Sequence, residues 1–480
     1  MIALLSPWVE RKYIAPPTSL LYLKYYLQDH GHKVDIIDCS NFGRDGDDVI
    51  DILKRHDYEV IGITAYTRER FAAYDLINRI RREIPKSLIV VGGKHFGFLA
   101  EETLKNLPVD IVVRGEGEVP LLNICDNIPW SAIPGISWAH PWNGEIFHNP
   151  PAHPFENIDQ FRCFDKADNY PLAGISKFDS KPYFSIMATR GCPNRCVFCS
   201  QNASKVRYRS IDSIMREIYE KITITGIRNV VFADSSLTIN GKFVRDLCAK
   251  LAEWDVRWTC YSRVNIDTSL LKTMKDAGLV SVEVGLESGS PKVLKAIKKN
   301  IQVDQVREFC KAAQSLGIKT YLFCMVSLPE ETVKDVDMTI SLVKELTPYI
   351  YYIGLQVTRI VPDAALYGIA KDKGLLPETF SWFEPYESPY ADILKDKYYS
   401  TLPVYVEHLS IEQITQKLTE FKHIIDSRLS NFAVLWKAVK YNLSQEGRKL
   451  LTPKNLAIKG YKLTRSLFTS IKNAGKYWRV

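Results

Sequence analysis

Three closely spaced cysteines give this 480-residue chain its clearest chemical signal. Cys192, Cys196 and Cys199 follow the pattern Cys-x3-Cys-x2-Cys, and Gly191 and Pro193 place them in a loop. Three thiolates are one fewer than an all-cysteine four-iron cluster uses, so one iron would stay open to another ligand. A structural zinc site uses four protein ligands, and no His lies within thirty residues of the loop. The spacing therefore predicts a 4Fe–4S cluster held by three cysteines.

The remaining cysteines share no spacing, and most lie in apolar stretches. We expect them to be reduced and to pack as small core residues. The apolar run at the N-terminus is too short for a signal peptide, and the sequence contains no stretch of about eighteen apolar residues. These features predict a cytoplasmic protein. The seven cysteines are Cys39, Cys125, Cys163, Cys248, Cys260, Cys310 and Cys324.

The elements that must position the cysteine loop form a repeated strand–helix pattern. The first predicted strand, residues 184–188, ends directly before the loop. Six such units in sequence predict an open, partial (β/α)6 barrel over residues 183–375, with its chemistry at the carboxyl ends of the strands. The five further strands are predicted at residues 229–233, 257–261, 281–285, 319–326 and 351–357.

An earlier strand–helix series occupies residues 1–126. It predicts a doubly wound, Rossmann-like parallel sheet, an α/β fold that binds ligands beyond the carboxyl ends of its strands. Three of those ends carry small or polar residues: Thr64-Ala65-Tyr66, Gly92-Gly93-Lys94-His95 and Arg114-Gly115-Glu116. Ordinary tight turns are the alternative for each, and their shared sheet edge favours a site. The strands are predicted at residues 2–5, 34–37, 60–64, 88–91 and 111–113.

Residues 127–182 hold eight of the 24 prolines and are predicted to be a linker. One hairpin is expected within it, with strands at 136–139 and 145–147 joined through Asn143-Gly144. Beyond residue 375 the repeat stops, and residues 376–480 are predicted to be a helical, basic C-terminal region. Residues 411–428 form its clearest helix.

The positive charge of the chain is concentrated at its C-terminal end. Residues 428–480 contain 12 Lys and Arg and one acidic residue, which leaves 51 basic and 54 acidic residues elsewhere. Aromatic side chains such as Trp436, Phe468 and Trp478 are interspersed among these charges. The tail could contact the inner face of the membrane peripherally, form solvated helices, or bind nucleic acid. Nucleic acid is the least favoured, because no recognisable RNA-binding module accompanies the charge.

A cysteine loop of this spacing, after the first strand of a βα barrel, resembles the radical S-adenosylmethionine (SAM) superfamily. Later strand ends extend the likeness, for example Val284-Gly285-Leu286-Glu287-Ser288-Gly289 and Met325-Val326-Ser327-Leu328-Pro329-Glu330. Residues 1–126 resemble the cobalamin-binding domain that precedes the barrel in one large branch, which includes the class B methyltransferases. The Asp-x-His-x-x-Gly pattern that ligates cobalt in some cobalamin proteins is absent, and Asp38-Cys39-Ser40 has Ser where that His belongs.

The resemblance implies three cofactors and a set of contacts. Cys192, Cys196 and Cys199 would bind the 4Fe–4S cluster, whose open iron chelates SAM. Alternative roles are a core position for Phe198, a surface ion pair for Arg263, a helix N-terminal charge for Glu287 and a turn or capping role for His95. The implied SAM contacts are Phe198, Asp234, Ser235, Arg263 and Glu287; the implied cobalamin contacts are Thr64, Ala65, Tyr66, Gly92, Gly93, His95, Gly115 and Glu116.

The resemblance further implies an activity. The expected function is a cobalamin-dependent radical SAM methyltransferase acting on an unactivated carbon of a small-molecule or lipid or isoprenoid substrate, with flavodoxin or ferredoxin as reductant. A rearrangement or cyclisation enzyme that uses the same cofactors is the first alternative. The second is a non-catalytic module that binds cobalamin or metal. No catalytic residue is assigned from the sequence.

Overall fold

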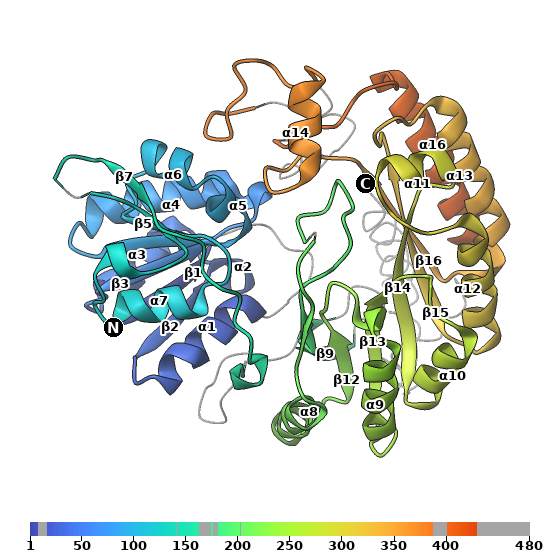
Figure 1. The fold of residues 1–480 in the computed structure, drawn as a ribbon, viewed down its shortest axis with the longest axis horizontal. Coiled ribbons are helices and arrows are strands. Elements are labelled where there is room, and N and C mark those ends of the chain that lie inside the picture. The colour runs from blue at the N-terminus through green and yellow to red at the C-terminus, as the bar shows by residue number, and fades with distance from the viewer. Residues whose placement is uncertain are drawn as a thin grey trace, which may run out of the picture.

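The computed structural model describes residues 1–7, 17–140, 142–162, 174–175, 181–201, 203–386 and 401–429. Two mainly parallel sheets, each flanked by helices, lie side by side in it (Figure 1). The predicted order of an α/β sheet domain followed by a partial barrel is confirmed. Residues 430–480, which carry nearly all of the basic tail, and Cys163 lie outside the described residues.

The N-terminal sheet has the strand order β2-β1-β3-β4-β5-β6-β7. Its first five strands are parallel, and the predicted hairpin forms and pairs antiparallel to β5. The hairpin therefore extends this sheet past residue 126. The strands are β1 (Ile2–Ser6), β2 (Val34–Asp38), β3 (Val60–Thr64), β4 (Leu88–Gly92), β5 (Ile111–Val113), β6 (Ile136–Ala139) and β7 (Ile146–His148).

Helices cover both faces of this sheet, which is why all five residues of β1 are buried. Alternate residues of that strand pack into different apolar clusters, with Leu5 in one and Leu4 in the other. The doubly wound prediction is thereby confirmed. The helices are α1 (Thr18–Asp29), α2 (Cys39–Phe42), α3 (Gly46–Lys54), α4 (Arg70–Glu83), α5 (Gly93–Phe98), α6 (Ala100–Asn106) and α7 (Glu118–Cys125), with the 3-10 turn η1 (Thr67–Glu69) before α4.

The second sheet has the order β16-β15-β14-β13-β12-β9-β8, and its six longer strands are parallel. Among the described residues no pairing joins β16 to β9, so the barrel is open, as predicted. Its strands are β8 (Gly174–Ile175), β9 (Pro182–Ile186), β12 (Asn229–Phe232), β13 (Arg257–Ser262), β14 (Leu279–Glu287), β15 (Lys319–Val326) and β16 (Tyr352–Val357).

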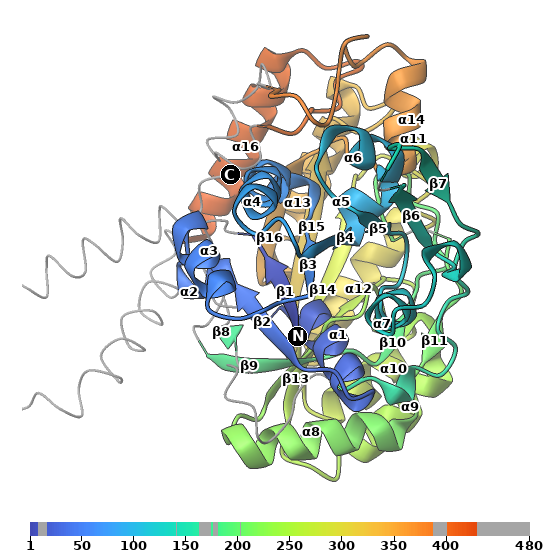
Figure 2. The ribbon, with the colours of Figure 1, turned by 90° about the vertical axis from the view of Figure 1, so that its left-hand side faces the viewer.

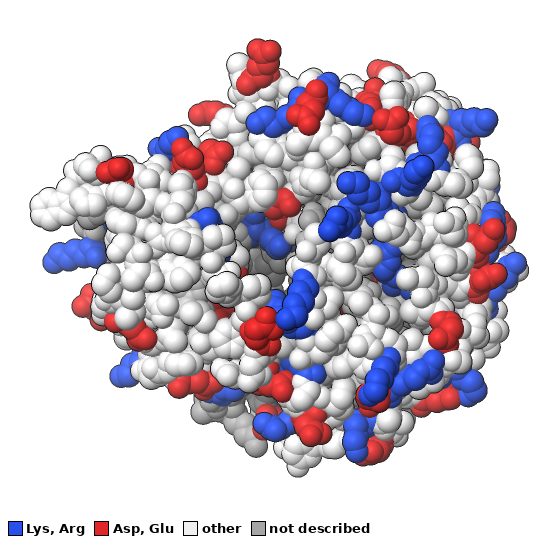
Figure 3. Space-filling view, viewed as in Figure 1, with Lys and Arg blue, Asp and Glu red and all other residues white. Residues whose placement is uncertain are grey.

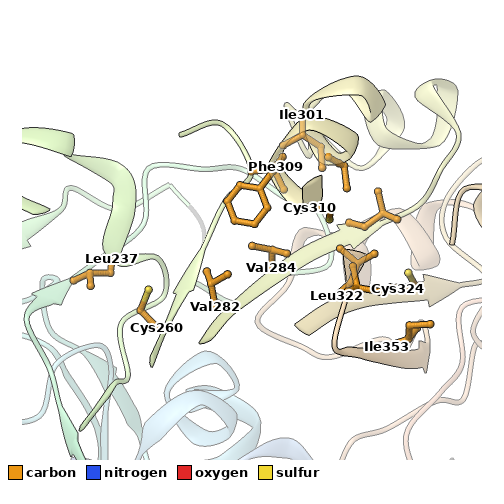
Figure 4. Close-up of a cluster of buried hydrophobic side chains, with 14 of the residues drawn as sticks. Leu237, Cys260, Val282, Val284, Ile301, Phe309, Cys310, Leu322, Cys324 and Ile353 are labelled. Atoms are coloured by element: carbon orange, nitrogen blue, oxygen red, sulfur yellow. The ribbon is translucent and has the colours of Figure 1, made fainter. Parts of the chain in front are cut away.

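The helices of the barrel lie on its outer side (Figure 1). Between them and the sheet is an apolar core, part of which is drawn in Figure 4. Cys260, Cys310 and Cys324 belong to this core, in agreement with the prediction for the scattered cysteines. The helices are α8 (Ile211–Thr225), α9 (Gly241–Leu251), α10 (Thr268–Asp276), α11 (Pro291–Ala296), α12 (Val303–Ser315) and α13 (Val333–Leu346).

The C-terminal region joins the two units. After α14 (Ala365–Asp372) the described chain contains no helix until α16 (Ile411–Leu429), which packs beside α13 (Figures 1 and 2). The segment between them contacts both sheets, because Phe383 packs in the N-terminal core and Tyr405 in the barrel core. None of the helices in the described residues is both long and apolar enough to cross a bilayer.

Candidate functional site

The cysteine loop is closed at its base by a short antiparallel ribbon. Its strands are β10 (Thr189–Arg190) and β11 (Arg207–Tyr208). Gly191 follows the first of them with a φ of +101°, and a Cβ there would collide with the backbone carbonyl of Lys205. Only glycine suits that position, because the φ is left-handed and the returning strand leaves no room. The loop is therefore held as a compact turn at the carboxyl end of β9.

Backbone contacts anchor the loop to two neighbouring helices. The amide of Val197 donates to the carbonyl of Ile297 at 3.1 Å, and the amide of Leu366 donates to the carbonyl of Val197 at 2.8 Å. The first contact reaches the end of α11 and the second the start of α14. The loop is thus positioned by segments about 100 and 170 residues away in the sequence.

Polar groups surround the three thiols. Asn194 donates to Sγ of Cys192 and the amide of Gln201 donates to Sγ of Cys199, both at 3.4 Å. Burial raises the pKa of Cys199, the Gln201 amide opposes that rise, and the neighbouring Cys196 and Cys192 add to it. A coordinated metal would lower the pKa of the thiol instead, because it binds the deprotonated thiolate. The loop therefore presents clustered thiols in a setting that suits metal coordination.

The arrangement of the sulfur atoms can be compared with that of a site for a single ion. Ligands of one tetrahedral zinc ion lie about 3.8 Å apart, given a Zn–S bond of about 2.3 Å. Among the described residues, only Glu330, Glu407 and His408 bring three ligand atoms within 4.8 Å of one another, and Lys373 already pairs with two of them. The sulfur atoms of Cys192, Cys196 and Cys199 do not all lie within that distance of one another.

Asp234 lies beneath the loop rather than on its surface. Its carboxylate accepts bonds from the amides of Ala188 and Thr189 and, at 2.7 Å, from the Thr189 hydroxyl. Burial raises the pKa of Asp234 to about 6. The carboxylate is thus bound to the backbone that leads into the loop, and the expected contact with the methionine end of SAM stays a prediction. Ser235, the next residue, is exposed.

Arg263, Lys299 and Glu287 form a chain of contacts beside the loop. Arg263 donates to the backbone carbonyls of Lys299 and Asn300, and Lys299 Nζ lies 2.7 Å from Oε1 of Glu287. Glu287 has a φ of +65°. A Cβ on Gly285 would collide with the Glu287 carboxylate and approach Lys299 Nζ, so glycine makes room for this buried pair.

A cavity of about 340 Å³ opens at the carboxyl ends of β14, β15 and β16. It brings together two of the expected SAM residues, Phe198 and Glu287, while Asp234 and Arg263 do not line it. Figure 3 shows this face of the molecule hollowed between the two sheet units, with both basic and acidic side chains around the hollow. The lining consists of Phe198, Glu287, Phe323, Cys324, Met325, Gln356, Val357, Arg359, Val361 and Leu402.

The carboxyl edge of the N-terminal sheet carries exposed apolar side chains. Tyr66 is 59% exposed, Phe98 58% and Phe42 45%, and each follows a strand of this sheet. Gly93 has a φ of +84°, and a Cβ there would strike the Thr64 hydroxyl. Open backbone and exposed rings at one edge fit a large, flat, partly apolar ligand such as a corrin.

His95 does not belong to that exposed edge. It is fully buried, its Nε2 lies 2.5 Å from the Tyr74 hydroxyl and its Nδ1 lies 3.4 Å from the Thr67 hydroxyl. Burial, reinforced by Arg70, lowers the pKa of His95 to about 3. The imidazole is therefore neutral and packed inside the domain, which is neither the turn nor the capping role raised as the alternative for it.

Glu116 connects the two units. Its carboxylate accepts bonds from both terminal nitrogens of Arg207, at 2.5 and 2.9 Å, and lies 3.6 Å from Arg190. Burial raises the pKa of Glu116, but the bonds from Arg207 and the Phe155 amide, together with the charges of Arg190 and Arg207, outweigh this and leave the pKa below its ordinary value. Arg190 also bonds Glu118 at 2.6 Å. The base of the cysteine loop is thus tied to the end of β5.

Arg70 and Lys94 are two positioning residues for which the sequence analysis assigned no role. Arg70 is fully buried and donates to the carbonyls of Trp382 and Thr401. Lys94 extends from the start of α5 to the carbonyl of Ser200, next to Cys199. The residues next to Arg70 and Lys94 in the sequence do not indicate these partners. Ser200 lies 106 residues after Lys94, and Thr401 lies 331 residues after Arg70.

Two family models match the chain. The radical SAM superfamily model matches residues 186–343, and the B12-binding domain model matches residues 8–124. These ranges contain the cysteine loop and most of the N-terminal sheet. The first match implies a 4Fe–4S cluster and SAM, and the second implies cobalamin. The first match agrees with the cysteine loop at the carboxyl end of β9, and the second agrees with the exposed carboxyl edge of the N-terminal sheet.

Curated relatives support the same pairing. An uncharacterized methyltransferase of Pyrococcus horikoshii is 31% identical over 84% of this chain and 86% of its own. The anaerobic magnesium-protoporphyrin IX monomethyl ester cyclase of Rubrivivax gelatinosus is 27% identical over 69% of this chain and 62% of its own. Among solved structures, the methyltransferase TsrM of Kitasatospora setae aligns with a TM-score of 0.68 at 17% identity, covering 89% of each chain. The cobalamin-dependent enzyme OxsB aligns with a TM-score of 0.66 at 14% identity, covering 98% of this chain and 71% of its own.

Proposed function

Because this chain belongs to the radical SAM superfamily and carries a B12-binding domain, we propose that it is a methyltransferase acting on an unactivated carbon. Its cofactors are a 4Fe–4S cluster, SAM and cobalamin. When bound, they supply hydrogen-atom abstraction and the transferred methyl group, and the protein supplies position and shielding. One observation supports the proposal above all: the cysteine loop and the carboxyl edge of the N-terminal sheet meet directly, through Lys94 and Ser200.

The residues divide into those that hold cofactors and those that support them. Cys192, Cys196 and Cys199 hold three irons, and Phe198 and Glu287 bind the adenine and ribose of SAM within the cavity. Gly285 and Lys299 support Glu287, since one leaves space for its carboxylate and the other pairs with it. Asp234 orients the backbone that leads into the loop.

Cobalamin binding is assigned to the exposed edge of the N-terminal sheet. Thr64, Ala65 and Tyr66 contribute one strand end, while Gly92, Gly93 and Gly115 leave the backbone accessible at two others. Glu116 and His95 support the geometry of that edge from behind, because their polar atoms already have protein partners. The acceptor substrate, a small molecule or a lipid, enters between this edge and the barrel cavity. Turnover also requires an external one-electron reductant such as a flavodoxin or ferredoxin.

The decisive experiment is anaerobic reconstitution with iron, sulfide and cobalamin, followed by reduction in the presence of SAM. We expect a 4Fe–4S optical spectrum, bound cobalamin, and formation of 5′-deoxyadenosine together with S-adenosylhomocysteine. A cell extract supplied as the source of substrate should yield a product one CH2 unit heavier. Absence of both SAM products from the fully reconstituted protein would refute the proposal.

A cyclisation or rearrangement is the second candidate, favoured by the similarity to the Rubrivivax gelatinosus cyclase. It predicts 5′-deoxyadenosine without stoichiometric S-adenosylhomocysteine, and a product that has gained no CH2 unit. A non-catalytic module would bind cobalamin and release neither compound. The same reconstitution therefore separates the three alternatives.

A further inference from the structure

Two segments that meet at the cysteine loop are rich in basic residues and contain no acidic residue. The first is the loop itself, residues 191–206, and the second, residues 288–303, runs through α11. They meet where Sγ of Cys196 lies 3.8 Å from the backbone carbonyl of Lys298. Basic residues therefore surround a ligand of the cluster. The six cations of the two segments are Arg195, Lys205, Lys292, Lys295, Lys298 and Lys299.

Three of these six cations already have acidic partners. The pairs are Lys299 with Glu287 at 2.7 Å, Lys292 with Asp335 at 2.8 Å and Lys205 with Glu156 at 3.2 Å. The other three, Arg195, Lys295 and Lys298, are exposed, and none of them forms an ion pair with a residue that the structure describes. We call these three side chains the basic surface. Their positive charge is available to a partner outside the chain.

The basic surface lies on the barrel side of the cysteine loop. Figure 3 shows basic side chains gathered beside the hollow, over the position that α11 occupies in Figure 1. The base of the loop differs, because Arg190 and Arg207 there are paired with Glu118 and Glu116 of the N-terminal domain. The side of the loop that faces the cobalamin domain is thus neutralised, and the side that faces α11 keeps its charge.

The backbone beneath the basic surface is held in place. The amide of Lys298 donates to the carbonyl of Lys295 at 3.1 Å at the end of α11. Arg263 donates to the carbonyls of Lys299 and Asn300, directly after Lys298. A fixed arrangement of charges sets the orientation in which an oppositely charged partner docks.

We propose that the basic surface is the docking site for an acidic one-electron carrier protein that reduces the cluster. Carboxylates of the carrier pair with Arg195, Lys295 and Lys298, which places its redox group next to Cys196. One electron leaves the reduced carrier and enters the cluster, and no atom or proton is transferred. The inference rests on the proposed function, because only a cluster that is reduced during turnover needs such a partner.

The position and the size of the basic surface favour a protein carrier over a nucleic acid. Electron transfer requires a donor close to the cluster, and Lys298 contacts a cluster ligand directly. Complexes of electron carriers have small, transient interfaces that a few charges suffice to form, and opposite charges speed the encounter. Nucleic acid binding gains its affinity from many phosphate contacts, and three cations supply few.

The test uses a recombinant acidic flavodoxin as the probe and the reconstituted holoenzyme with SAM present. Oxidised flavodoxin is titrated calorimetrically. Formation of 5′-deoxyadenosine is then followed with reduced flavodoxin, or with reduced methyl viologen as a small cationic donor. We expect flavodoxin affinity to fall about tenfold or more between ionic strengths of about 0.01 M and about 1 M, because the Debye length shrinks from about 30 to about 3 Å.

Variants locate the effect. The double variant Lys295→Glu with Lys298→Glu should weaken flavodoxin binding and slow flavodoxin-driven SAM cleavage by about tenfold or more. Its rate with methyl viologen should not fall. Arg195→Gln should weaken flavodoxin binding about two- to fivefold and provides a second probe if the double variant does not fold.

The matched control is the double variant Lys86→Glu with Lys344→Glu, which changes the net charge by the same amount. Both lysines are exposed, and they precede β4 and β16, at the amino ends of the strands and therefore opposite the cysteine loop. This control should bind flavodoxin and cleave SAM as the wild type does.

Three results would overturn the proposal. The first is a flavodoxin affinity that changes neither with ionic strength nor in the Lys295→Glu, Lys298→Glu variant. The second is an equal loss of rate with flavodoxin and with methyl viologen, which would mean that the lysines act on the cluster itself. The third is a short single-stranded RNA that binds this surface more tightly than flavodoxin does, which would assign the surface to a nucleic acid.

The wild-type yield of 5′-deoxyadenosine with methyl viologen separately tests the proposed function. A protein that forms none with either donor refutes that function. The calorimetric titration still decides whether the basic surface binds the acidic carrier, because it measures binding without turnover.

Discussion

The Nζ atom of Lys94 lies 3.0 Å from the backbone carbonyl of Ser200 and donates a hydrogen bond to it. Lys94 opens α5 at the edge of the B12-binding sheet, and Ser200 follows the last cysteine of the cluster loop. Burial raises the pKa of the neighbouring Asp363, and Lys94 partly opposes this rise. One side chain therefore connects the cobalamin domain, the cluster loop and the segment after β16.

Lys94→Met should loosen the cluster loop, because the lost hydrogen bond is one of its direct links to the N-terminal domain. We expect faster amide hydrogen exchange across residues 191–206, measured by mass spectrometry on the apoprotein. Lys86→Met, an exposed lysine of the same domain, is the matched control and should leave the loop unchanged. Identical exchange in the two variants would show that the contact does not restrain the loop.

Cys196→Ala should abolish the cluster, since two thiolates cannot hold three irons of a 4Fe–4S core. After anaerobic reconstitution we expect loss of the broad visible absorbance and of most bound iron, together with loss of reductive SAM cleavage. Cys248→Ala removes a buried core thiol on α9 and should retain the iron. Full iron content in Cys196→Ala would contradict the assignment of this cysteine.

Tyr66→Ala should weaken cobalamin binding by about tenfold, the cost of losing roughly 1.4 kcal/mol of aromatic contact. Tyr66 is 59% exposed at the carboxyl end of β3, where the proposed corrin surface lies. Tyr219→Ala is the control, because Tyr219 on α8 is similarly exposed at 52% but distant from that edge. Equilibrium dialysis against cobalamin measures the difference, and equal affinities would place the cofactor elsewhere.

Arg70→Met should destabilise the folded protein by about 3 kcal/mol or more, because it leaves buried carbonyls without donors. Arg70 donates to the carbonyls of Thr67, Trp382 and Thr401, and burial lowers its pKa to about 10. Arg82→Met on the same helix removes a side chain that is 67% exposed and should cost less than 1 kcal/mol. Denaturant unfolding of both variants provides the comparison.

Glu331 should make stability depend on pH. Burial raises its pKa from 4.5 to about 7, against the opposing bonds from the amides of Leu328 and Ser327. Between these two values the folded state binds more protons than the unfolded state, so the free energy of unfolding falls as the pH rises through this window. The largest loss is about 3 kcal/mol, reached above pH 7.

The matched comparison is Glu331→Gln, which cannot titrate. The unfolding free energy of the wild type relative to this variant should fall between pH 5 and pH 8. Glu308→Gln, at an exposed site on α12, should follow the wild type. A difference between the wild type and Glu331→Gln that stays constant with pH would mean that Glu331 has the same pKa folded and unfolded.

Two features of this protein could be predicted from residues that lie close together in the sequence. The first is the set of cluster ligands, because Cys192, Cys196 and Cys199 lie within one short loop and their spacing alone identifies the chemistry. The second is the pair of βα series, because buried parallel strands produce continuous apolar runs between helical patterns. Both signals depend on residues close together in the chain.

The individual roles of polar residues at the site could not be predicted in this way. Asp234 was expected to contact SAM, which stays a prediction, but its bonds to amides 45 and 46 residues earlier in the chain were not foreseen. Glu116 was expected to contact cobalamin, which stays a prediction, but its pair with Arg207, 91 residues later, was not foreseen. In both cases the residue type predicted a polar contact, and only the fold identified the partner.

The amino-acid sequence by itself determined the fold class, the cluster loop and the family to which this chain belongs. The tertiary structure decided which side chains face the cavity, as Phe198, Glu287 and Arg359 do, and which are used within the protein, as His95, Glu116 and Asp234 are. The physical reason is that a buried polar group must find a partner, and that partner is set by long-range packing which no local pattern encodes.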